Sequence, residues 1–256
     1  MVFDSHMHTK FSADSEMLAT EALARADDLN LGVVFTEHFD YGLELDGKTF
    51  TFDAATYMRE YKNLRGEKVL LGAEIGLRKF ARAANENFLA AADFDFVIGS
   101  IHLVDDMDIY YPNFYADKDK ATAYGKYFRQ MAQEIALADF DALGHIDYIC
   151  RAAPYDDPEI DYETFHEEID TVLKILVDRQ KVMEVNTRRF DSERAIRELV
   201  PVYKKYRALG GRFVTIGSDA HKVDAIGNYF ARALDFVREV DLTPVTFRER
   251  KLIPLT

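Results

Sequence analysis

Short apolar runs rich in β-branched residues alternate along the chain with longer stretches in which apolar positions recur every three or four residues. The first pattern is typical of buried parallel strands and the second of amphipathic helices. Strands are predicted at residues 2–6, 32–36, 69–74, 94–101, 142–146, 182–185 and 213–217. Helices are predicted at 16–30, 53–65, 79–92, 117–138, 161–180, 193–209 and 223–239. Asp14 or Ser15 is expected to cap the first helix.

This alternation predicts an α/β protein with a mainly parallel sheet. Right-handed crossovers, and the need to cover both faces of such a sheet, favour closure into a TIM-like barrel. An open, doubly wound sheet is the alternative. The run 244–247 could add a strand or be a tail. With 256 residues and no evident linker, the chain fits a single barrel domain, residues 1–256.

A long connection at 103–117, rich in aspartate and tyrosine, follows the fourth predicted strand. Loops of this length in small domains are often functional. A surface excursion packed on its own aromatic residues is the other interpretation. Its acidic side chains at 105–108 could meet a cationic amine, judged by charge sign alone.

The formal net charge of −13 argues against a nucleic-acid partner, because it repels a polyanion. A small phosphate ester remains possible, since a few local arginines and metal ions can hold it. The single cysteine, Cys150, excludes an internal disulfide and fits a reducing compartment. No apolar run reaches about 18 residues and the first motif begins at residue 4, so we expect a cytoplasmic protein without leader or membrane contact. The oligomeric state stays open.

Six of the seven histidines lie at or just beyond the end of a predicted strand, and acidic residues share these positions. In a parallel barrel, strand ends of this kind meet at one mouth. A hydrogen-bonded rim position would explain any one of them, but hardly the whole set. The candidate metal ligands are His6, His8, Asp14, His38, Glu74, His102, His145, Asp219 and His221. His166 falls inside a helix and is expected to be a surface or capping residue.

Nine candidate ligands exceed the needs of one ion, which takes three or four protein ligands. We therefore expect two or three divalent ions, with Glu74 as the bridging carboxylate. Mixed imidazole and carboxylate ligands suit Zn, Fe or Mn. Asp4 is expected to orient a ligand histidine. Catalysis is assigned to Glu74, Asp219 and His221.

At these positions the sequence resembles the PHP (polymerase and histidinol phosphatase) family, and most of all its histidinol-phosphate phosphatases. The matching motifs run through most of the chain: Asp4-Ser-His6-Met-His8, Thr36-Glu37-His38, Gly72-Ala73-Glu74, Gly99-Ser100-Ile101-His102, Gly144-His145-Ile146-Asp147 and Ser218-Asp219-Ala220-His221. The resemblance implies a distorted (β/α)7 barrel and a trinuclear metal site. Some phosphatases of the family have a histidine where Asp14 stands, so this carboxylate is a point of departure.

By this resemblance the nine ligands divide into three sets. One ion would be held by His6, His8, Glu74 and Asp219, and a second by Glu74, His102 and His145. The third would be held by Asp14, His38 and His221.

The expected activity is hydrolysis of L-histidinol phosphate to L-histidinol and phosphate by a metal-bound hydroxide. Arginine binds phosphate through two donors, and the resemblance places Arg151 and Arg188 on the substrate phosphate, although spacing cannot choose between Arg188 and Arg189. Asn186 is assigned to the substrate, and Glu184 orders the same loop or touches the substrate. Cys150 lacks a paired base and is interpreted as core.

Three other interpretations remain at this stage. The first is a PHP phosphoesterase that acts on another small phosphomonoester or on a nucleic-acid end. The second is an amidohydrolase-type barrel, which would want eight strands and a carbamylated lysine. The third is a metal-binding protein without turnover. Under the favoured interpretation, deleting eight N-terminal residues should abolish activity while costing only part of the fold.

Overall fold

Seven parallel strands form a barrel in the computed structural model, which describes residues 1–255. In spatial order these strands are β1 (Phe3–Met7), β2 (Gly32–Phe39), β5 (Val69–Gly76), β6 (Phe96–Ser100), β9 (Ala142–Leu143), β10 (Val182–Asn186) and β11 (Phe213–Gly217). The barrel closes between β1 and β11 through a parallel bridge of Met7 with Ala220. Across this seam, His8 N donates to Ala220 O at 2.8 Å. The predicted strands and the distorted TIM-like (β/α)7 barrel are confirmed, and the open sheet is excluded.

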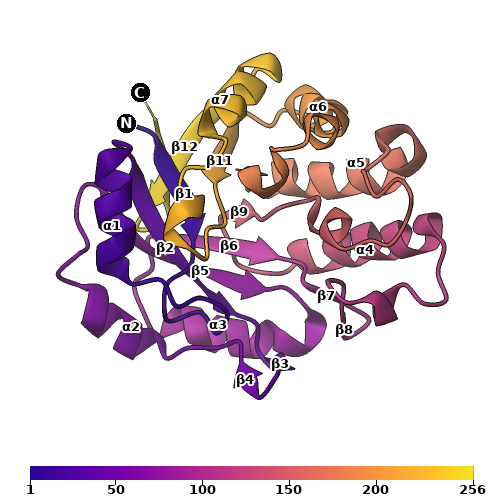
Figure 1. Ribbon diagram of the computed structural model, residues 1–256. Coiled ribbons are helices and arrows are strands. Elements are labelled where there is room, and N and C mark those ends of the chain that lie inside the picture. Colours follow the sequence, from indigo (N-terminus) through magenta and orange to yellow (C-terminus); the bar gives the residue numbers. More distant parts are fainter. Residues whose placement is uncertain (256) are drawn as a thin grey trace.

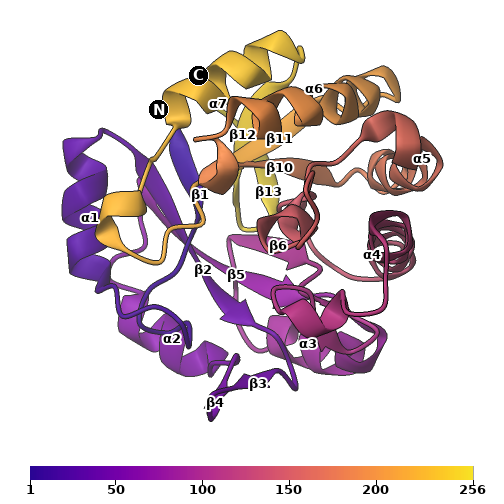
Figure 2. The ribbon, with the colours of Figure 1, turned by 45° about the vertical axis from the view of Figure 1, so that its right-hand side comes forward.

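Helices surround the strands, as Figures 1 and 2 show from two directions. They are α1 (Ala19–Asp28), α2 (Ala54–Tyr61), α3 (Arg82–Ala90), α4 (Lys120–Ile135), α5 (Tyr162–Asp178), α6 (Glu193–Ala208) and α7 (Phe230–Glu239). Short 3-10 turns lie at Lys79–Ala81, Pro112–Phe114, Tyr148–Arg151, Thr187–Arg189 and Val223–Ala225. Each helix overlaps its predicted range, because the apolar face that produced the periodicity packs against the sheet.

The predicted cap of the first helix and the predicted start of the last helix are wrong. Leu18 occupies the N-cap position of the first helix, where Asp14 or Ser15 was expected, and makes no side-chain cap. The Ser15 hydroxyl instead donates to the carbonyls of His8 and His221. The last helix begins at Phe230 and not at residue 223, because Gly227 and Tyr229 both adopt positive φ angles (69° and 59°) that interrupt a right-handed helix.

A final β-hairpin covers the end of the barrel at which the strands begin. The run 244–247 lies in β12 (Thr243–Arg248), which pairs parallel to β11 and antiparallel to β13 (Lys251–Pro254). Its Val245 and Phe247 are buried against the first residues of the parallel strands, including Phe3 and Phe96. The barrel is therefore packed with apolar side chains at this end, and the opposite end is free to carry polar groups.

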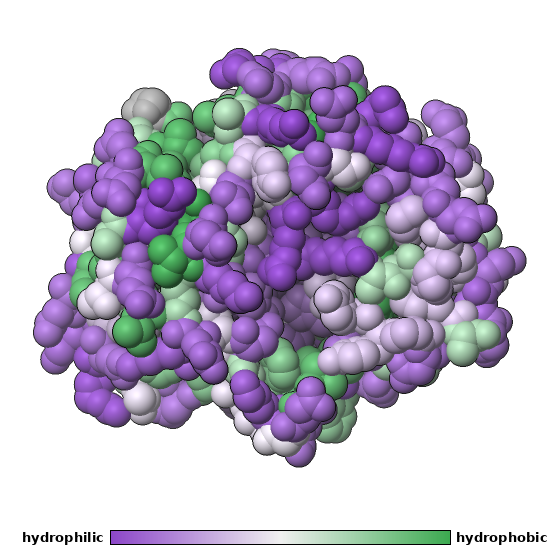
Figure 3. All heavy atoms as spheres, viewed as in Figure 1, coloured by the Kyte–Doolittle hydropathy of each residue, from purple (hydrophilic) through white to green (hydrophobic). Residues whose placement is uncertain are grey.

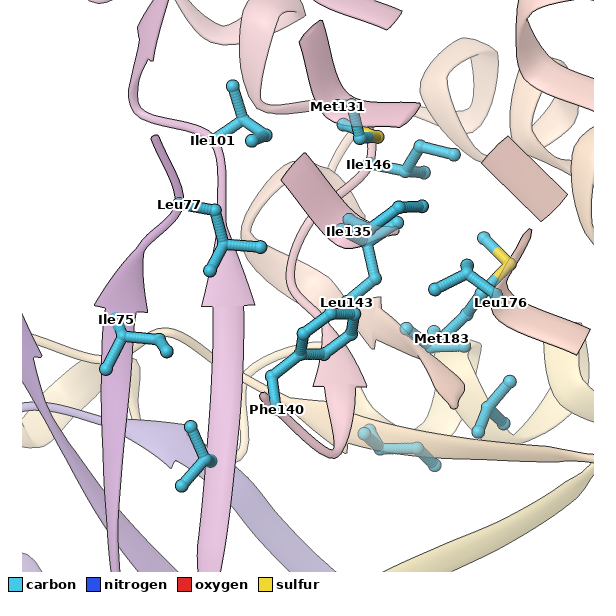
Figure 4. Close-up of a cluster of buried hydrophobic side chains, with 14 of the residues drawn as sticks. Ile75, Leu77, Ile101, Met131, Ile135, Phe140, Leu143, Ile146, Leu176 and Met183 are labelled. Carbon is cyan, nitrogen blue, oxygen red and sulfur yellow. The ribbon is translucent and has the colours of Figure 1, made fainter. Parts of the chain in front are cut away.

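The main apolar core fills the layer between barrel and helices. Figure 4 shows part of it, where Ile75 and Leu77 from β5 and the residues after it face Met131 and Ile135 from α4. Leu143 and Met183 continue the same cluster toward α5. Burial of this amount of aliphatic surface is the main stabilising contribution to the barrel.

Strand β9 is shorter than the predicted 142–146. The chain leaves the ladder after Gly144, whose amide still donates to Gly99 O at 3.0 Å and where a Cβ would lie 2.3 Å from Ser100 Oγ. The next amide, His145 N, then donates to Glu184 Oε2 at 2.7 Å instead of to a strand carbonyl. The Glu184 carboxylate thus accepts the hydrogen bond that a strand carbonyl would otherwise accept, and His145 turns toward the barrel mouth.

Two small hairpins border the mouth and were not predicted. One comprises β3 (Glu44–Leu45) and β4 (Lys48–Thr49), in the connection after β2. The other comprises β7 (Leu103–Val104) and β8 (Met107–Asp108), so the connection 103–117 is ordered by its own hydrogen bonds. Asp105 and Asp106 both have positive φ angles (52° and 59°), which is the geometry of a tight two-residue hairpin turn.

The position of β1 argues against the expectation that deleting eight N-terminal residues would cost only part of the fold. All five residues of β1 are buried, and the strand lies between β2 and β11. Removing residues 1–8 would open the barrel at its seam and uncover the apolar side chains that pack against Phe3, such as Phe96 and Val245. Such a deletion would therefore cost most of the fold, so point substitutions are the better way to separate activity from folding.

Candidate active site

The nine predicted ligand residues converge at the mouth where the parallel strands end. Glu74, at the end of β5, is the fully buried centre of this group. Its Oε1 lies 2.8 Å from His145 Nε2 and 3.3 Å from His102 Nε2. Its Oε2 lies 2.9 Å from His38 Nδ1 and 3.3 Å from His6 Nε2. One carboxylate therefore touches imidazoles that come from β1, β2 and the ends of β6 and β9.

The remaining carboxylates complete the cluster on either side. Asp219 Oδ1 lies 3.4 Å from His8 Nε2 and 3.8 Å from His6 Nε2. Asp14 Oδ2 lies 3.1 Å from His221 Nε2 and 3.6 Å from His38 Nε2. The contacts of Asp219 with His6 and His8, and of Asp14 with His38 and His221, fall within the sets that the family resemblance implied, whereas the contact of Glu74 with His38 crosses from one set to another. His166, by contrast, is exposed on α5, and its Nδ1 lies 2.9 Å from the carbonyl oxygen of Glu163.

The arrangement fits divalent metal ions. Four groups of three ligand atoms each lie within 4.8 Å of one another: His6, His8 and Asp219; His6, Glu74 and His145; His38, Glu74 and His102; and His8, His38 and His221. The Nε2 atoms of His6 and His8 face each other at 3.1 Å. Glu74 Oε2 and His38 Nδ1 are buried without a hydrogen bond. Cations between these atoms would satisfy lone pairs that otherwise repel or lack a partner.

Electrostatics support the same conclusion. Burial alone would lower the pKa of His6, but Glu184, Glu74 and Asp219 outweigh it and hold this pKa well above its usual value. For Asp219, burial alone would raise the pKa, yet Arg151 and His6 hold it well below its usual range. Positive charge is thus favoured beside His6 and Asp219, whereas burial, together with His38 and His221, holds the pKa of His8 well below its usual value, so that His8 offers a neutral nitrogen to a metal ion.

Acidic and hydroxyl side chains hold the outer nitrogens of three histidines. His6 Nδ1 lies 2.6 Å from Glu184 Oε1, and His102 Nδ1 lies 2.9 Å from Asp40 Oδ1. His8 Nδ1 lies 3.0 Å from Ser12 Oγ, which donates to Glu37. Such partners fix the ring orientation and direct the other nitrogen inward. The sequence pattern missed Asp40 and Ser12, although Asp40 is two residues beyond His38 and emerges on the same side of β2.

Asp4 does not bind a histidine ring as predicted. Its carboxylate accepts from Ser218 N at 2.9 Å, Ser218 Oγ at 2.6 Å and Gly227 N at 3.0 Å. Burial raises the pKa of Asp4 to about 6. The side chain therefore holds the segment after β11, which carries Asp219 and His221, and on its own strand it accepts from the backbone amide of His6 at 3.4 Å.

Beside the cluster lies a cavity of about 500 Å³, lined by metal-site residues, arginines and aromatic side chains. Figure 3 shows the hollow, surrounded mainly by hydrophilic residues. Arg151 and Arg188 line it. Arg151 Nη2 lies 2.7 Å from Asp219 Oδ2, and Arg188 Nη1 lies 3.5 Å from Asp219 Oδ1. Two guanidinium groups thus flank one carboxylate of the cluster.

The structure distinguishes Arg188 from Arg189, which their spacing in the sequence could not do. Arg189 also borders the cavity, but its guanidinium is bound by Asp147 at 3.0 Å and Glu159 at 2.6 Å. Asn186 does not line the cavity; its Oδ1 accepts from Arg151 Nη2 and from Arg188 N, each at 3.1 Å. It is thus placed to position the arginines rather than to contact a ligand.

Cys150 is buried in the core below the mouth. Burial raises the pKa of its thiol to about 12, so the reactive thiolate is scarce at neutral pH. We expect iodoacetamide to leave the folded protein unmodified and its turnover unchanged, as measured by mass spectrometry and phosphate release. We also expect Cys150→Ala to retain most of the turnover. Rapid inactivation that accompanies labelling of Cys150 would contradict this assignment.

Comparison with known proteins agrees with these features. The PHP domain family matches residues 4–188. A probable histidinol-phosphatase from Clostridium acetobutylicum is 43% identical over 98% of both chains. The histidinol-phosphatase of Lactococcus lactis subsp. lactis is 32% identical over 90% of this chain and 89% of its own.

A solved structure has the same fold. The crystal structure of histidinol phosphate phosphatase from Lactococcus lactis, complexed with zinc, L-histidinol and phosphate, superimposes with a TM-score of 0.92. It is 28% identical and covers 98% of each chain. In residues 1–255, every helix is too short or too polar to span a lipid bilayer. On the family match, the extent of identity and the shared barrel, the chain belongs to the PHP domain family.

Proposed function

We propose that the protein is a metal-dependent phosphatase that hydrolyses L-histidinol phosphate to L-histidinol and phosphate, a step of histidine biosynthesis. The observation that carries the proposal is the placement of two arginines beside a buried cluster of imidazoles and carboxylates in one cavity. The names of the relatives supply the substrate, since both curated relatives above are histidinol-phosphatases. All of these groups come from one barrel, so we propose that residues 1–256 act as one catalytic domain.

We assign the two or three ions to the ligand sets that the family resemblance implied, with Glu74 shared between the first and second. Zinc is the first candidate, because the Lactococcus lactis neighbour contains it. The donor types equally suit iron or manganese. When bound, divalent ions supply positive charge for the phosphoryl group and lower the pKa of a water molecule.

The chain's own residues would hold the phosphate. Arg151 is nearly buried, and its planar guanidinium can donate to phosphate oxygens through two parallel hydrogen bonds. Asp219 and Asn186 orient it. Arg188 is half-exposed and reaches the same carboxylate from the other side. Together the two arginines would neutralise the negative charge that the phosphoryl group carries in the transition state.

A second group of residues would receive the alcohol part of the substrate. Asp108, Tyr110 and Tyr148 line the cavity. Among the acidic residues 105–108, Asp108 lines this cavity, whereas Asp105 pairs with Lys126 and Asp106 pairs with Arg78. We therefore assign Asp108 to the ammonium group of the substrate, and aromatic side chains to its imidazole.

Arg188 and Arg189 are expected to respond differently to substitution. Arg188→Ala should raise the KM for L-histidinol phosphate and lower kcat/KM by about 100-fold, because a charge-assisted contact to phosphate is lost. Arg189→Ala should mainly lower thermal stability, because it leaves Asp147 and Glu159 without their shared partner. Steady-state kinetics and thermal unfolding of both variants provide the check. The reverse pattern would assign the phosphate contact to Arg189.

The direct test is a phosphate-release screen with metal content measured on the same sample. L-histidinol phosphate should exceed other small phosphomonoesters in kcat/KM by at least about tenfold. If another metabolite phosphate were hydrolysed faster, the proposed substrate would be wrong, but the proposed reaction, hydrolysis of a phosphomonoester, would stand. Degradation of a labelled oligonucleotide at physiological salt would favour the nucleic-acid alternative, and metal-loaded protein without turnover would favour the non-catalytic one.

The amidohydrolase alternative has little support. Seven parallel strands form the barrel, and Glu74 occupies the position where a carbamylated lysine would be required.

A further inference from the structure

Two loops on one side of the mouth supply the part of the cavity wall that carries aromatic and apolar side chains. The connection after β2 contributes Leu43, Leu45 and Phe50, and the connection after β6 contributes Asp108, Tyr110 and Tyr111. The arginines come from a different part of the rim, after β9 and β10. The two loops therefore face the alcohol part of the substrate rather than its phosphate.

Arg78 lies between these loops. It follows β5, and β5 pairs with β2 on one side and with β6 on the other. Its Nη2 donates to the carbonyl of Tyr41, in the connection after β2. Its Nη1 donates to Asp106 Oδ1 at 3.1 Å, in the turn of the β7–β8 hairpin. One guanidinium group thus joins both loops.

The surroundings favour an arginine at this position. The side chain is only 11% exposed, and its guanidinium carbon lies 5.4 Å from the centre of the Phe80 ring. Gly42 has a φ of 77°, and a Cβ there would lie 3.0 Å from Arg78 Nη2. A planar group with donors on two edges can serve two acceptors and stack on a ring at once, which the ammonium group of lysine cannot do in the same way.

The hairpin side of the link is anchored independently. Gln130 Nε2 on α4 donates to Leu103 O at 2.7 Å, and Gln130 Oε1 accepts from Asp105 N at 3.1 Å. The β7–β8 hairpin is therefore held by α4 without Arg78. The loop around Tyr41, which carries Leu43 and Leu45 into the cavity, also has backbone bonds of its own, from Asp40 N to Phe50 O at 2.6 Å and from Phe50 N to Leu43 O at 3.1 Å. Arg78 adds the link between this loop and the hairpin.

We propose that Arg78 is a positioning residue for substrate selectivity: it fixes the loop around Tyr41 against the β7–β8 hairpin and so shapes the wall that receives the alcohol part of the substrate. Arg78 does not itself line that cavity, so it acts through the loops. The inference rests on the proposed function. The alternative, a surface ion pair without functional effect, accounts only for the contact with Asp106, which is 78% exposed.

Inhibition by the two products reports separately on the part of the site that binds the alcohol and the part that binds phosphate. Inhibition constants for L-histidinol and for inorganic phosphate would be measured on the metal-loaded wild type and on Arg78→Met, which keeps the apolar stem but removes both donors. The constant for L-histidinol should rise about threefold to tenfold, because the loop must be ordered during binding. The constant for phosphate should change by less than about twofold, since Arg151 and Arg188 keep their partners.

Two further variants control for other effects. Asp106→Asn removes the charge of an exposed partner without threatening the fold, and should shift the L-histidinol constant in the same direction by a smaller factor. Arg129→Met removes an arginine that pairs with Glu168 between α4 and α5, and should change neither constant. Equal changes in both constants, or an unchanged constant for L-histidinol in Arg78→Met, would overturn the inference. Wild type that releases no phosphate from L-histidinol phosphate would overturn the proposed function, and this inference with it.

Discussion

Glu74→Gln is expected to lower kcat by about 1,000-fold or more while leaving the barrel folded. The glutamine has the same size, but it replaces one anionic oxygen with an amide nitrogen that cannot ligate a cation. Glu74 touches imidazoles with both oxygens, so neither orientation of the amide avoids this loss. Phosphate release and metal content would be measured on the same protein, and we expect both to fall.

Glu37→Gln provides a matched comparison. Glu37 is equally buried, but it accepts from Thr9 and Ser12 and touches no ligand imidazole directly. Its loss should lower kcat by about 10–100-fold, which is the effect typical of a residue that holds a metal ligand in place through hydrogen bonds. Circular dichroism of both variants would show that the fold is retained. A Glu74→Gln variant with more than about a tenth of the wild-type turnover would contradict the central role of this carboxylate.

The second large effect is expected for Asp219→Asn. Asp219 has a φ of 55°, a left-handed conformation that asparagine tolerates well, so the backbone should not change. The substitution removes the negative charge that lies beside His8 and between Arg151 and Arg188. We expect kcat/KM to fall by about 100–1,000-fold, because both a metal position and the arginines are disturbed.

Asp241→Asn is the control for this second variant. Asp241 also has a positive φ, of 54°, but its side chain is exposed and pairs with Arg207 far from the mouth. This variant should keep wild-type kinetics and thermal stability. If both asparagine variants lost turnover equally, the effect of Asp219→Asn would have to be attributed to backbone conformation rather than to the site.

Several features followed from the sequence for a simple physical reason. Alternation of apolar runs and amphipathic stretches predicts a parallel barrel, and the topology of such a barrel brings the ends of all its strands to one rim. Histidines and carboxylates at those ends therefore had to meet, however far apart they lie in the chain. The positions of His6 and His221 at the ends of predicted strands were enough to place both residues in one cluster.

Other features depended on contacts that no local pattern contains. Arg188 and Arg189 are neighbours in sequence, and only the positions of Asp147 and Glu159 show that the second is held in an ion-pair network. Asp4 was assigned to a histidine but binds the backbone after β11, since strand spacing gives the direction of a side chain and not its partner.

The sequence could predict the barrel but not individual polar contacts, because these depend on interactions of different range. Periodicity reflects burial, which acts on whole elements, so the sequence by itself determined the barrel and the composition of its rim. Hydrogen bonds and ion pairs are sensitive to differences of a few tenths of an ångström in the distance between atoms from different elements. Only the tertiary structure could decide that Asn186 orients Arg151 and that Arg78 joins two loops.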